Sequence, residues 1–363
     1  MRILLIGEYS GFYKSLKFGL HELGHEVLHI SAGDGWKGIG SDILISNKYS
    51  GKKAFLDIYL KYIYHILRNR NFDFVLLINP FIVTQKRGSN DLLVELLSKL
   101  NGKLVLSVAG DDYFVDKLWA TPESSPTGYT WVQDSLKYDR PSHLEIYQKE
   151  VSKNWNTKLL EKVAGIIPTS YEYYKAYENL HEHVELISLP FVTNQLGELD
   201  SDEDFSTLKV FHGINRVGAK GSHYILQAKQ IVEKKYPSDF KFSIVEKVPY
   251  ADYLTTFDNC HLFFDQTNSA YLGYNGLEGL AKNKIVLGGA EEKALAMLGT
   301  NSKECPAVNI LPNADDIVKK LLVLKETNRD ELKHRMAQGR SYLKKYHDAV
   351  MIAKKYEKFL IKL

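Results

Sequence analysis

The segment from His212 to Gly221 combines glycines with two cations at the end of a short apolar run. Glycines let a backbone turn tightly and approach a ligand closely, and Arg216 and Lys220 add two positive charges beside the start of the next helix. This combination predicts a diphosphate site. The alternative is an ordinary glycine-rich connection with solvated cations, and the G-x-x-x-x-G-K-S/T spacing of a P-loop is absent. The predicted ligand-binding residues of this segment are Gly213, Asn215, Arg216, Lys220 and Gly221.

A second polar, glycine-bearing loop starts at Asp265 and leads into a helix that contains Glu278. We expect Glu278 in the first turn of that helix, where the helix dipole favours a carboxylate that can accept hydrogen bonds from a ribose diol. In the alternative, Glu278 only caps the helix. The predicted ligand-binding residues of this loop are Asp265, Gln266, Gly273, Tyr274, Asn275, Gly276 and Glu278.

Both loops need a sheet to position them, because open parallel sheets bind ligands beyond the carboxyl ends of their strands. Short apolar runs alternate with helical patterns along the chain, which indicates βαβ units. The predicted strands are 2–6, 26–30, 73–78, 103–108, 165–167 and 184–188 in the first half, and 208–212, 241–245, 261–264, 284–287 and 308–310 in the second. From residue 314 the pattern is helical, with Gly339 as a soft break. The predicted fold class is α/β, with two Rossmann-like, doubly wound parallel-sheet domains and C-terminal helices.

The 363 residues exceed what one hydrophobic core usually serves, so two domains are expected. Residues 1–189 form the first Rossmann-like domain, and residues 208–345 form the second. Residues 190–207 are predicted to be a linker, because Pro190 and an acidic, polar stretch interrupt the strand and helix pattern. The last helix, 346–363, is expected to pack back on the first domain.

Composition excludes several classes of protein. The net charge is +3 and charges of both signs alternate, so no nucleic-acid surface is indicated. No apolar run approaches the length that spans a bilayer, and two cysteines are too few for a disulfide framework, so we expect a cytoplasmic protein. Basic helices after residue 317 leave peripheral contact with the inner membrane face open as an alternative to solvated helix faces.

Residues 208–289 resemble the donor half of group 1, family 4-like bacterial glycosyltransferases. In that family an Arg and a Lys around a K-G step hold the donor diphosphate, which Arg216, Lys220 and Gly221 match. Its E-x7-E motif ends in a glutamate that binds the ribose, and the L-E-G-L-A stretch around Glu278 is similar. The opening I-L-L-I-G-E-Y-S and the later A-G-D-D-Y resemble the family's N-terminal half. The resemblance implies the GT-B fold, in which two domains face a central cleft.

One position departs from the family pattern. Counting back eight residues from Glu278 gives Ala270, where the family commonly has the first glutamate of E-x7-E. That glutamate approaches the transferred sugar. Its contacts must therefore come from Asp265 with Gln266, or from the backbone amides of residues 272–274.

In the N-terminal half, Glu8, Tyr9 and Ser10 follow the first strand and are the predicted acceptor-side residues. A tight strand-to-helix turn would explain this loop equally well. Asp111 and Asp112 end the strand 103–108, where the resemblance places residues that face the acceptor, so one of them is expected to orient the acceptor hydroxyl. Alternatively, the pair caps the helix that follows.

The resemblance implies transfer of a sugar from a nucleotide-sugar donor to a glycan or lipid-linked acceptor, with retention, in bacterial surface polysaccharide assembly. Arg216 and Lys220 would neutralise the departing diphosphate. No cofactor is expected, and adjacent aspartates are not a D-x-D metal motif, so no metal is expected either. Two rival functions are a sugar-nucleotide epimerase of the same architecture and a non-catalytic nucleotide-sugar-binding subunit, the latter suggested by Ala270.

Overall fold

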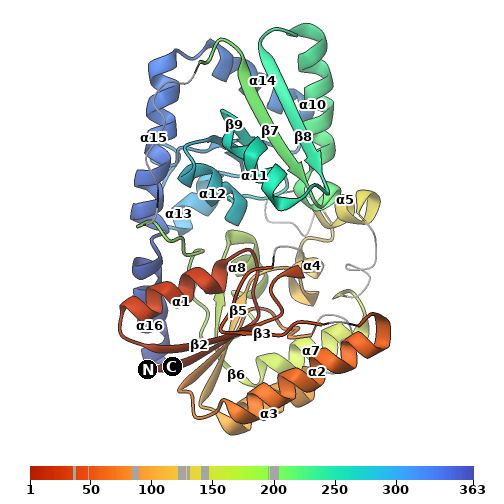
Figure 1. Ribbon diagram of the computed structural model, residues 1–363, viewed down its shortest axis with the longest axis vertical. Coiled ribbons are helices and arrows are strands. Elements are labelled where there is room, and N and C mark those ends of the chain that lie inside the picture. The colour runs from red at the N-terminus through yellow and green to blue at the C-terminus, as the bar shows by residue number, and fades with distance from the viewer. Residues whose placement is uncertain are drawn as a thin grey trace. The chain divides into compact units, whose positions relative to one another are not determined.

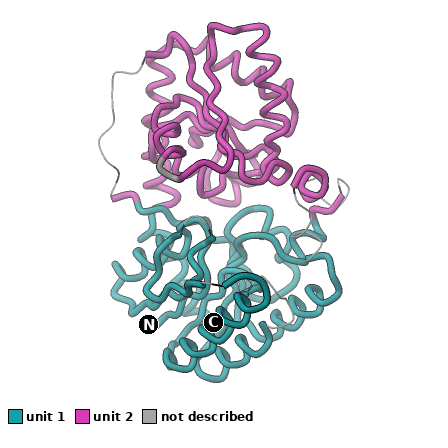
Figure 2. The backbone as a smooth tube through the Cα atoms, turned by 45° about the vertical axis from the view of Figure 1, so that its right-hand side comes forward, with its two compact units in different colours: residues 1–118, 145–192, 348–363 teal, residues 119–144, 193–347 magenta. Residues whose placement is uncertain are grey.

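The computed structural model describes residues 1–35, 38–47, 49–83, 90–121, 128, 131–139, 147–194, 196 and 204–363. By its internal contacts the chain divides into two compact units (Figure 2). Unit 1 comprises residues 1–118, 145–192 and 348–363, and unit 2 comprises residues 119–144 and 193–347. Each unit is built on its own parallel sheet, which confirms the predicted α/β class with two parallel-sheet domains.

Unit 1 contains a six-stranded sheet in the order β3-β2-β1-β4-β5-β6. Its strands are β1 (Arg2–Ile6), β2 (Glu26–Ser31), β3 (Ile43–Leu44), β4 (Phe74–Leu77), β5 (Lys103–Val108) and β6 (Val163–Pro168). Its helices are α1 (Phe12–Glu22), α2 (Gly51–Arg68), α3 (Asn90–Leu100), α4 (Tyr113–Leu118), α7 (Glu150–Leu160), α8 (Tyr171–Tyr177) and α16 (Ala349–Lys362). Helices α1 and α16 cover one face of the sheet, and α2, α3 and α7 cover the other (Figure 1). Central strands covered on both faces are continuous apolar runs, as β1 and β4 are.

The C-terminal helix α16 completes the core of unit 1. Its residues Ile352, Ala353 and Tyr356 are buried in one cluster with residues of α1 and β1. The two helices approach each other closely at Gly19, where an added Cβ would lie 2.0 Å from the carbonyl oxygen of Ala349. A glycine at this point therefore lets α16 pack against α1.

Unit 2 contains a five-stranded sheet in the order β11-β10-β9-β7-β8. Its strands are β7 (Leu208–Ile214), β8 (Phe240–Glu246), β9 (Leu262–Phe264), β10 (Ile285–Gly288) and β11 (Val308–Asn309). Its helices are α5 (Trp131–Tyr138), α9 (Val217–Lys220), α10 (Ser222–Lys235), α11 (Tyr250–Asp258), α12 (Tyr274–Ala281), α13 (Glu292–Met297), α14 (Ala314–Glu326) and α15 (Arg329–Tyr346). Helices α10 and α14 pack together over the sheet, and their apolar residues join the strands in one core.

Two local predictions are wrong, and one short strand was not predicted. Residues 184–188 form no strand beyond a single bridge between Ile166 and Val184, because this segment only follows the edge of the sheet. The two-residue edge strand β3 is too short to produce a sequence signal. Gly339 does not break a helix: it lies inside α15, where an added Cβ would be 2.9 Å from the carbonyl oxygen of Leu280 in α12. The part of the predicted linker at 195 and 197–203 lies outside the described residues.

Candidate functional site

The centre of the candidate donor site is a buried ion pair at the carboxyl end of β9. Asp265 directly follows β9, is 1% exposed, and accepts a hydrogen bond of 2.8 Å from the backbone N–H of Gly273. Its other carboxylate oxygen lies 3.4 Å from the Nζ of Lys220, whose side chain is also buried. One carboxylate therefore connects the chain after β7 to the residue that precedes α12.

Glycines make this approach geometrically feasible. An added Cβ on Gly276, in the first turn of α12, would lie 2.7 Å from the Asp265 carboxylate. Gly221 has a φ of +67°, and its Cβ would lie 1.9 Å from the Oγ1 of Thr267. Lys220 is further held by its own carbonyl oxygen, which accepts a 2.9 Å bond from the N–H of Thr267. The glycine pattern of both loops therefore serves close packing around the ion pair.

A buried histidine that the sequence analysis did not select as a site residue forms hydrogen bonds to both of these segments. His212 is fully buried, and desolvation lowers its pKa to about 4, so its ring is neutral at pH 7. Its Nδ1 lies 3.2 Å from the carbonyl oxygen of Phe264, which can only accept, so Nδ1 donates. Its Nε2 then accepts from the hydroxyl of Ser222 at 2.8 Å. His212 thus joins the end of β9 to the start of α10.

Helix α5 supplies polar groups that sequence reasoning also missed. Asp139, the residue after α5, accepts hydrogen bonds from the N–H groups of Gly218 at 3.0 Å and Ala219 at 2.9 Å. Asn268, which follows the Asp265 loop, donates to Asp134 of α5 at 2.9 Å. An added Cβ on Gly218 would lie 2.1 Å from the carbonyl oxygen of Asp134. Helix α5 thereby fixes α9, but its place far upstream in the chain provides no local signal for this contact.

The remaining predicted donor residues take different positions. Asn215 and Arg216 are exposed at the end of β7, and Gln266 donates to the carbonyl oxygen of Tyr271 at 3.4 Å. Tyr274 and Asn275 open α12 and are half-buried. An added Cβ on Gly213 would lie 2.6 Å from the ring of Tyr253, so this glycine accommodates α11.

Glu278 is not in the first turn of its helix, which corrects the prediction. Helix α12 begins at Tyr274, so Glu278 is its fifth residue and is half-buried one turn further along. The helix starts earlier because Gly273, held by Asp265, already provides the N-cap. The role of Glu278 therefore cannot be that of an N-terminal cap, and ribose binding stays a prediction.

The loop before α12 accounts in terms of packing for the absence of a glutamate at position 270. Ala270 is completely buried, and its carbonyl oxygen accepts from the N–H of Glu291 at 2.9 Å. The neighbouring Tyr271 is anchored by its hydroxyl, which lies 2.7 Å from both the hydroxyl of Tyr342 and the Nε2 of His347. Position 270 thus lies in the core of unit 2, where a glutamate would be desolvated.

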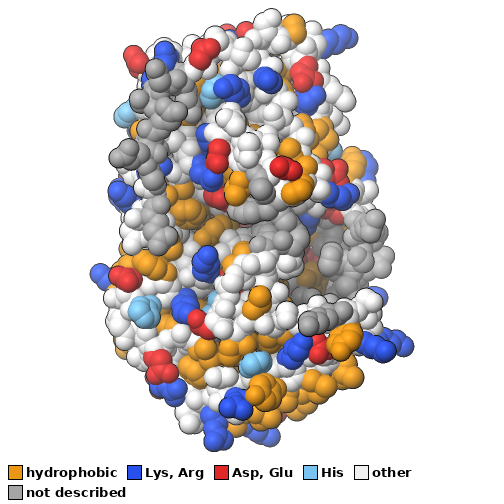
Figure 3. Space-filling view, viewed as in Figure 1, with side chains coloured by type: hydrophobic (Ala, Val, Ile, Leu, Met, Phe, Trp, Pro, Cys, Tyr) orange, Lys and Arg blue, Asp and Glu red, His pale blue; other side chains and the backbone are white. Residues whose placement is uncertain are grey.

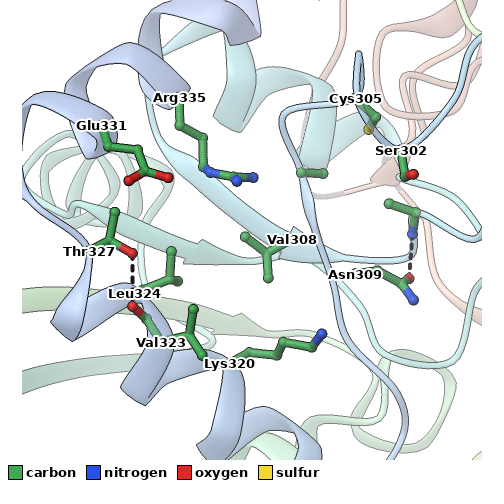
Figure 4. A pocket seen from close by; sticks show the side chains of 12 residues that line it. Ser302, Cys305, Val308, Asn309, Lys320, Val323, Leu324, Thr327, Glu331 and Arg335 are labelled. Carbon is green, nitrogen blue, oxygen red and sulfur yellow. Dashed lines mark hydrogen bonds between the residues drawn. The ribbon is translucent and has the colours of Figure 1, made fainter.

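A separate cavity of about 310 Å³ opens between α14, α15 and the chain around β11 (Figure 4). Arg335 and Lys320 contribute cations to its lining, and the side-chain oxygen of Asn309 accepts from the N–H of Ala290 at 2.7 Å. None of the predicted donor residues lines this cavity. The buried ion pair, and not this cavity, is therefore the better candidate for donor chemistry.

In unit 1, Glu8 has a structural role. It is 4% exposed, and its carboxylate accepts from the N–H groups of Gly11 at 3.0 Å and Lys14 at 2.9 Å, at the start of α1. Burial raises the pKa of Glu8 to about 7, although these two bonds favour its charged form. This geometry matches the strand-to-helix alternative for the loop.

The two adjacent aspartates separate into different roles. Asp112 is completely buried, accepts from the N–H groups of Phe114 at 2.9 Å and Val115 at 3.0 Å, and receives the hydroxyl of Tyr177 at 2.7 Å. Burial raises the pKa of Asp112 to about 6. It therefore caps α4, and its predicted catalytic role is not supported. Asp111 is only half-buried at the end of β5 and stays the candidate.

The loop after β1 lies beside the loop after β5. The Tyr9 ring lies 3.4 Å from the position that a Cβ on Gly110 would take. Ser10 has a φ of 57°, and its N–H donates to Asp34 at 2.8 Å. The buried Asn79 after β4 donates to the carbonyl oxygen of Asp111 at 3.2 Å. Three strand ends thus bring Tyr9, Ser10 and Asp111 to one edge of the sheet.

Solved structures share this architecture over the whole chain. Sucrose-phosphate synthase from Thermosynechococcus elongatus superposes with a TM-score of 0.62 at 12% identity, covering 100% of this chain and 98% of that chain. HepE from Anabaena, in complex with UDP-glucose, gives 0.60 at 13% identity and covers 100% of both chains. A protein described as a UDP-N-acetylglucosamine 2-epimerase from Listeria monocytogenes gives 0.52 at 12% identity, covering 98% of this chain and 94% of that one.

No protein-family model and no curated protein matches the sequence. At 12–13% identity the structural likeness establishes the fold alone, which is GT-B: two parallel-sheet α/β domains with C-terminal helices. None of the helices within the described ranges combines the length and hydropathy needed to cross a membrane.

Proposed function

We propose that this chain is a glycosyltransferase that takes a sugar from a nucleoside-diphosphate sugar and transfers it to a glycan or lipid-linked acceptor. The observation that carries the proposal is the buried Lys220, held by Asp265 directly beside the N-terminus of α12. An ammonium group and the N–H groups of a helix N-terminus together favour a diphosphate. The GT-B fold supports the proposal at the level of architecture.

In the proposed reaction an acceptor hydroxyl oxygen forms a bond to the anomeric carbon while the bond from that carbon to the diphosphate oxygen breaks, and the hydroxyl proton passes to the departing diphosphate. The nucleoside diphosphate leaves with its electron pair, and Lys220 and Arg216 stabilise its negative charge. Glu278 is proposed to bind the ribose. Retention of configuration is proposed on the resemblance to family 4-like enzymes.

The acceptor is proposed to bind at the strand ends of unit 1. Tyr9, Ser10 and Asp111 lie there together, and Asp111 is the carboxylate that could orient a hydroxyl. Asp112 and Glu8 are not included in this proposal, because both are buried and their carboxylates accept hydrogen bonds from backbone N–H groups. Because HepE is described in complex with UDP-glucose, uridine-diphosphate sugars are the first donors to test.

A sugar-nucleotide epimerase is the second candidate, since one structure of similar fold carries that description. An epimerase would convert a nucleotide sugar in the absence of any acceptor. Chromatography of the donor after incubation with the protein alone therefore separates the two functions: a new nucleotide-sugar epimer contradicts transfer.

The first experiment measures thermal stabilisation by nucleoside diphosphates and their sugars. A specific ligand raises the unfolding midpoint by mass action. We expect a rise with one nucleotide that is lost in Arg216→Ala/Lys220→Ala and reduced in Glu278→Ala, followed by acceptor-dependent release of the nucleoside diphosphate. No rise with any nucleotide contradicts the donor site, and binding without release under any acceptor favours a non-catalytic binding subunit.

A further inference from the structure

Helix α2 exposes a row of large apolar side chains in unit 1. Leu56, Leu60, Tyr64 and Leu67 are 55%, 54%, 52% and 49% exposed. Their spacing places them within an arc of about 80°, because an α-helix advances 100° per residue. The buried residues of the same helix are Ala54, Tyr62 and Ile66. The exposed row is therefore a second apolar face, which the core of unit 1 does not use.

Cations lie at both ends of this row. Lys52 and Lys53 precede it, Arg68 and Arg70 follow it, and all four are exposed. The one carboxylate within α2, Asp57, is bonded by Lys61 of the same helix at 2.6 Å. Figure 3 shows the hydrophobic side chains gathered over α2 at the lower right, with Lys and Arg side chains beside them. The surface is thus apolar along its centre and positive at its ends.

The contact between Arg68 and Tyr64 places a positive charge directly beside the exposed apolar row. Arg68 donates from Nη1 to the Tyr64 hydroxyl at 3.1 Å, and its guanidinium carbon lies 5.5 Å from the centre of the Tyr64 ring. Tyr and Arg suit the boundary between lipid headgroups and acyl chains, because each has an apolar part and a polar end.

We propose that this surface, formed by Leu56, Leu60, Tyr64 and Leu67 with the flanking cations, docks on an anionic lipid bilayer. A single apolar row on a long helix can enter the acyl boundary, and Lys and Arg pair with anionic headgroups. Charge decides between a bilayer and a second copy of the chain, because two copies of α2 would bring like charges together. The inference goes beyond the proposed transferase chemistry and does not depend on it.

This proposed membrane surface differs from the C-terminal basic helices, which the sequence analysis considered for membrane contact. The apolar face of α16 is buried in the core of unit 1. Among the large hydrophobic residues after 314, Val323 and Ile361 are exposed, and they belong to different helices. These helices offer cations without a continuous apolar row.

The test is co-sedimentation of the full chain with vesicles of phosphatidylcholine alone or of equal parts phosphatidylcholine and phosphatidylglycerol. We expect binding to the anionic vesicles that weakens as salt is raised, because exposed charges are screened. Leu56→Gln/Leu60→Gln should weaken partitioning roughly tenfold through lost apolar burial. Lys52→Gln/Lys53→Gln should weaken it roughly tenfold and flatten its salt dependence.

Ile361→Gln is the matched control, because Ile361 is 70% exposed in the basic C-terminal helix of the same unit. It should leave vesicle binding unchanged. Thermal unfolding of every variant checks that it folds. Equal binding to both vesicle types overturns the proposal, and so does binding to neither. It is also overturned if Ile361→Gln loses vesicle binding while Leu56→Gln/Leu60→Gln keeps it. A dimer in light scattering that Leu56→Gln/Leu60→Gln abolishes overturns it too, and identifies a second copy as the occupant.

Discussion

Replacing Asp265 with Asn removes the counter-charge of Lys220 while keeping an oxygen that can accept from the Gly273 N–H. The two side chains are 1% and 9% exposed, so the ammonium is left buried without its partner. Breaking a buried pair costs about 3–5 kcal/mol, and we take the lower end because the N–O distance of 3.4 Å is long. For a domain of the size of unit 2, about 3 kcal/mol lowers the unfolding midpoint by roughly 6–12 °C.

The assay is thermal unfolding with and without a nucleoside diphosphate. If Lys220 binds the diphosphate, the ligand supplies the missing negative charge, so it should raise the midpoint more in Asp265→Asn than in the wild type. Asp258→Asn is the matched control: Asp258 forms an ion pair with Lys282 whose side chains are 55% and 29% exposed, and such pairs contribute about 0–1 kcal/mol.

Two results would refute this reasoning. A midpoint of Asp265→Asn no lower than that of Asp258→Asn would show that Lys220 does not need the carboxylate. A fall in the midpoint that the nucleoside diphosphate does not offset would show that the buried pair is structural, and Lys220 would then lose its proposed role with the donor.

Three further predictions concern the other contacts. Asp139→Asn should weaken nucleotide binding several-fold, because the carboxylate that caps α9 contributes about 1 kcal/mol, and Asp139→Glu, which keeps a carboxylate, should bind like the wild type. Calorimetric titration measures the affinities, and equal affinity in all three proteins contradicts this prediction. Asp112 has its pKa raised to about 6, so the folded state binds its proton more tightly than the unfolded chain does, and stability falls as pH rises from about 4 to 6. In Asp112→Asn the free energy of unfolding, measured in urea at several pH values, should fall by about 2–3 kcal/mol less over this pH range than in the wild type. The same pH dependence in both proteins would show that Asp112 does not have a raised pKa. Gly19→Ala should lower the free energy of unfolding by about 3 kcal/mol, because its Cβ would lie 2.0 Å from the Ala349 carbonyl oxygen. Gly40→Ala should change it little, because a Cβ there meets nothing within 4 Å. Equal urea midpoints for the two variants would show that α16 shifts to accommodate the methyl group.

Most of the strands and the order of the elements were readable from the sequence. Runs such as 2–6 and 103–108 match β1 and β5, because central strands covered on both faces are rich in apolar residues. The loops after 212 and 264 were recognisable from their own residues: the first combines glycines with Arg216 and Lys220, and the second combines glycines with Asp265, Gln266 and Glu278. The fold class and the candidate donor loops therefore followed from local composition.

The position of a side chain relative to segments distant in the chain could not be predicted from the sequence. Asp111 and Asp112 are identical in type and adjacent, yet only the packing of α8 buries Asp112 and supplies the Tyr177 hydroxyl. Glu278 was placed one turn too early, because the start of α12 depends on Asp265 holding Gly273. The same holds for α5, whose residues join unit 2 although the chain on both sides of 119–144 belongs to unit 1.

By itself the sequence determined two parallel α/β sheets, most of their strands, and two glycine-bearing loops, of which the first was predicted to bind a diphosphate and the second a ribose. Local hydrophobic period and residue type are sufficient for these, since each depends on a few neighbouring residues. Tertiary structure alone decided that Asp265 holds Lys220, that His212 is neutral and structural, that Asp112 is a cap, and that α2 leaves an apolar row exposed. Burial and pairing are properties of segments brought together by folding, and the residues that meet there are far apart in the chain.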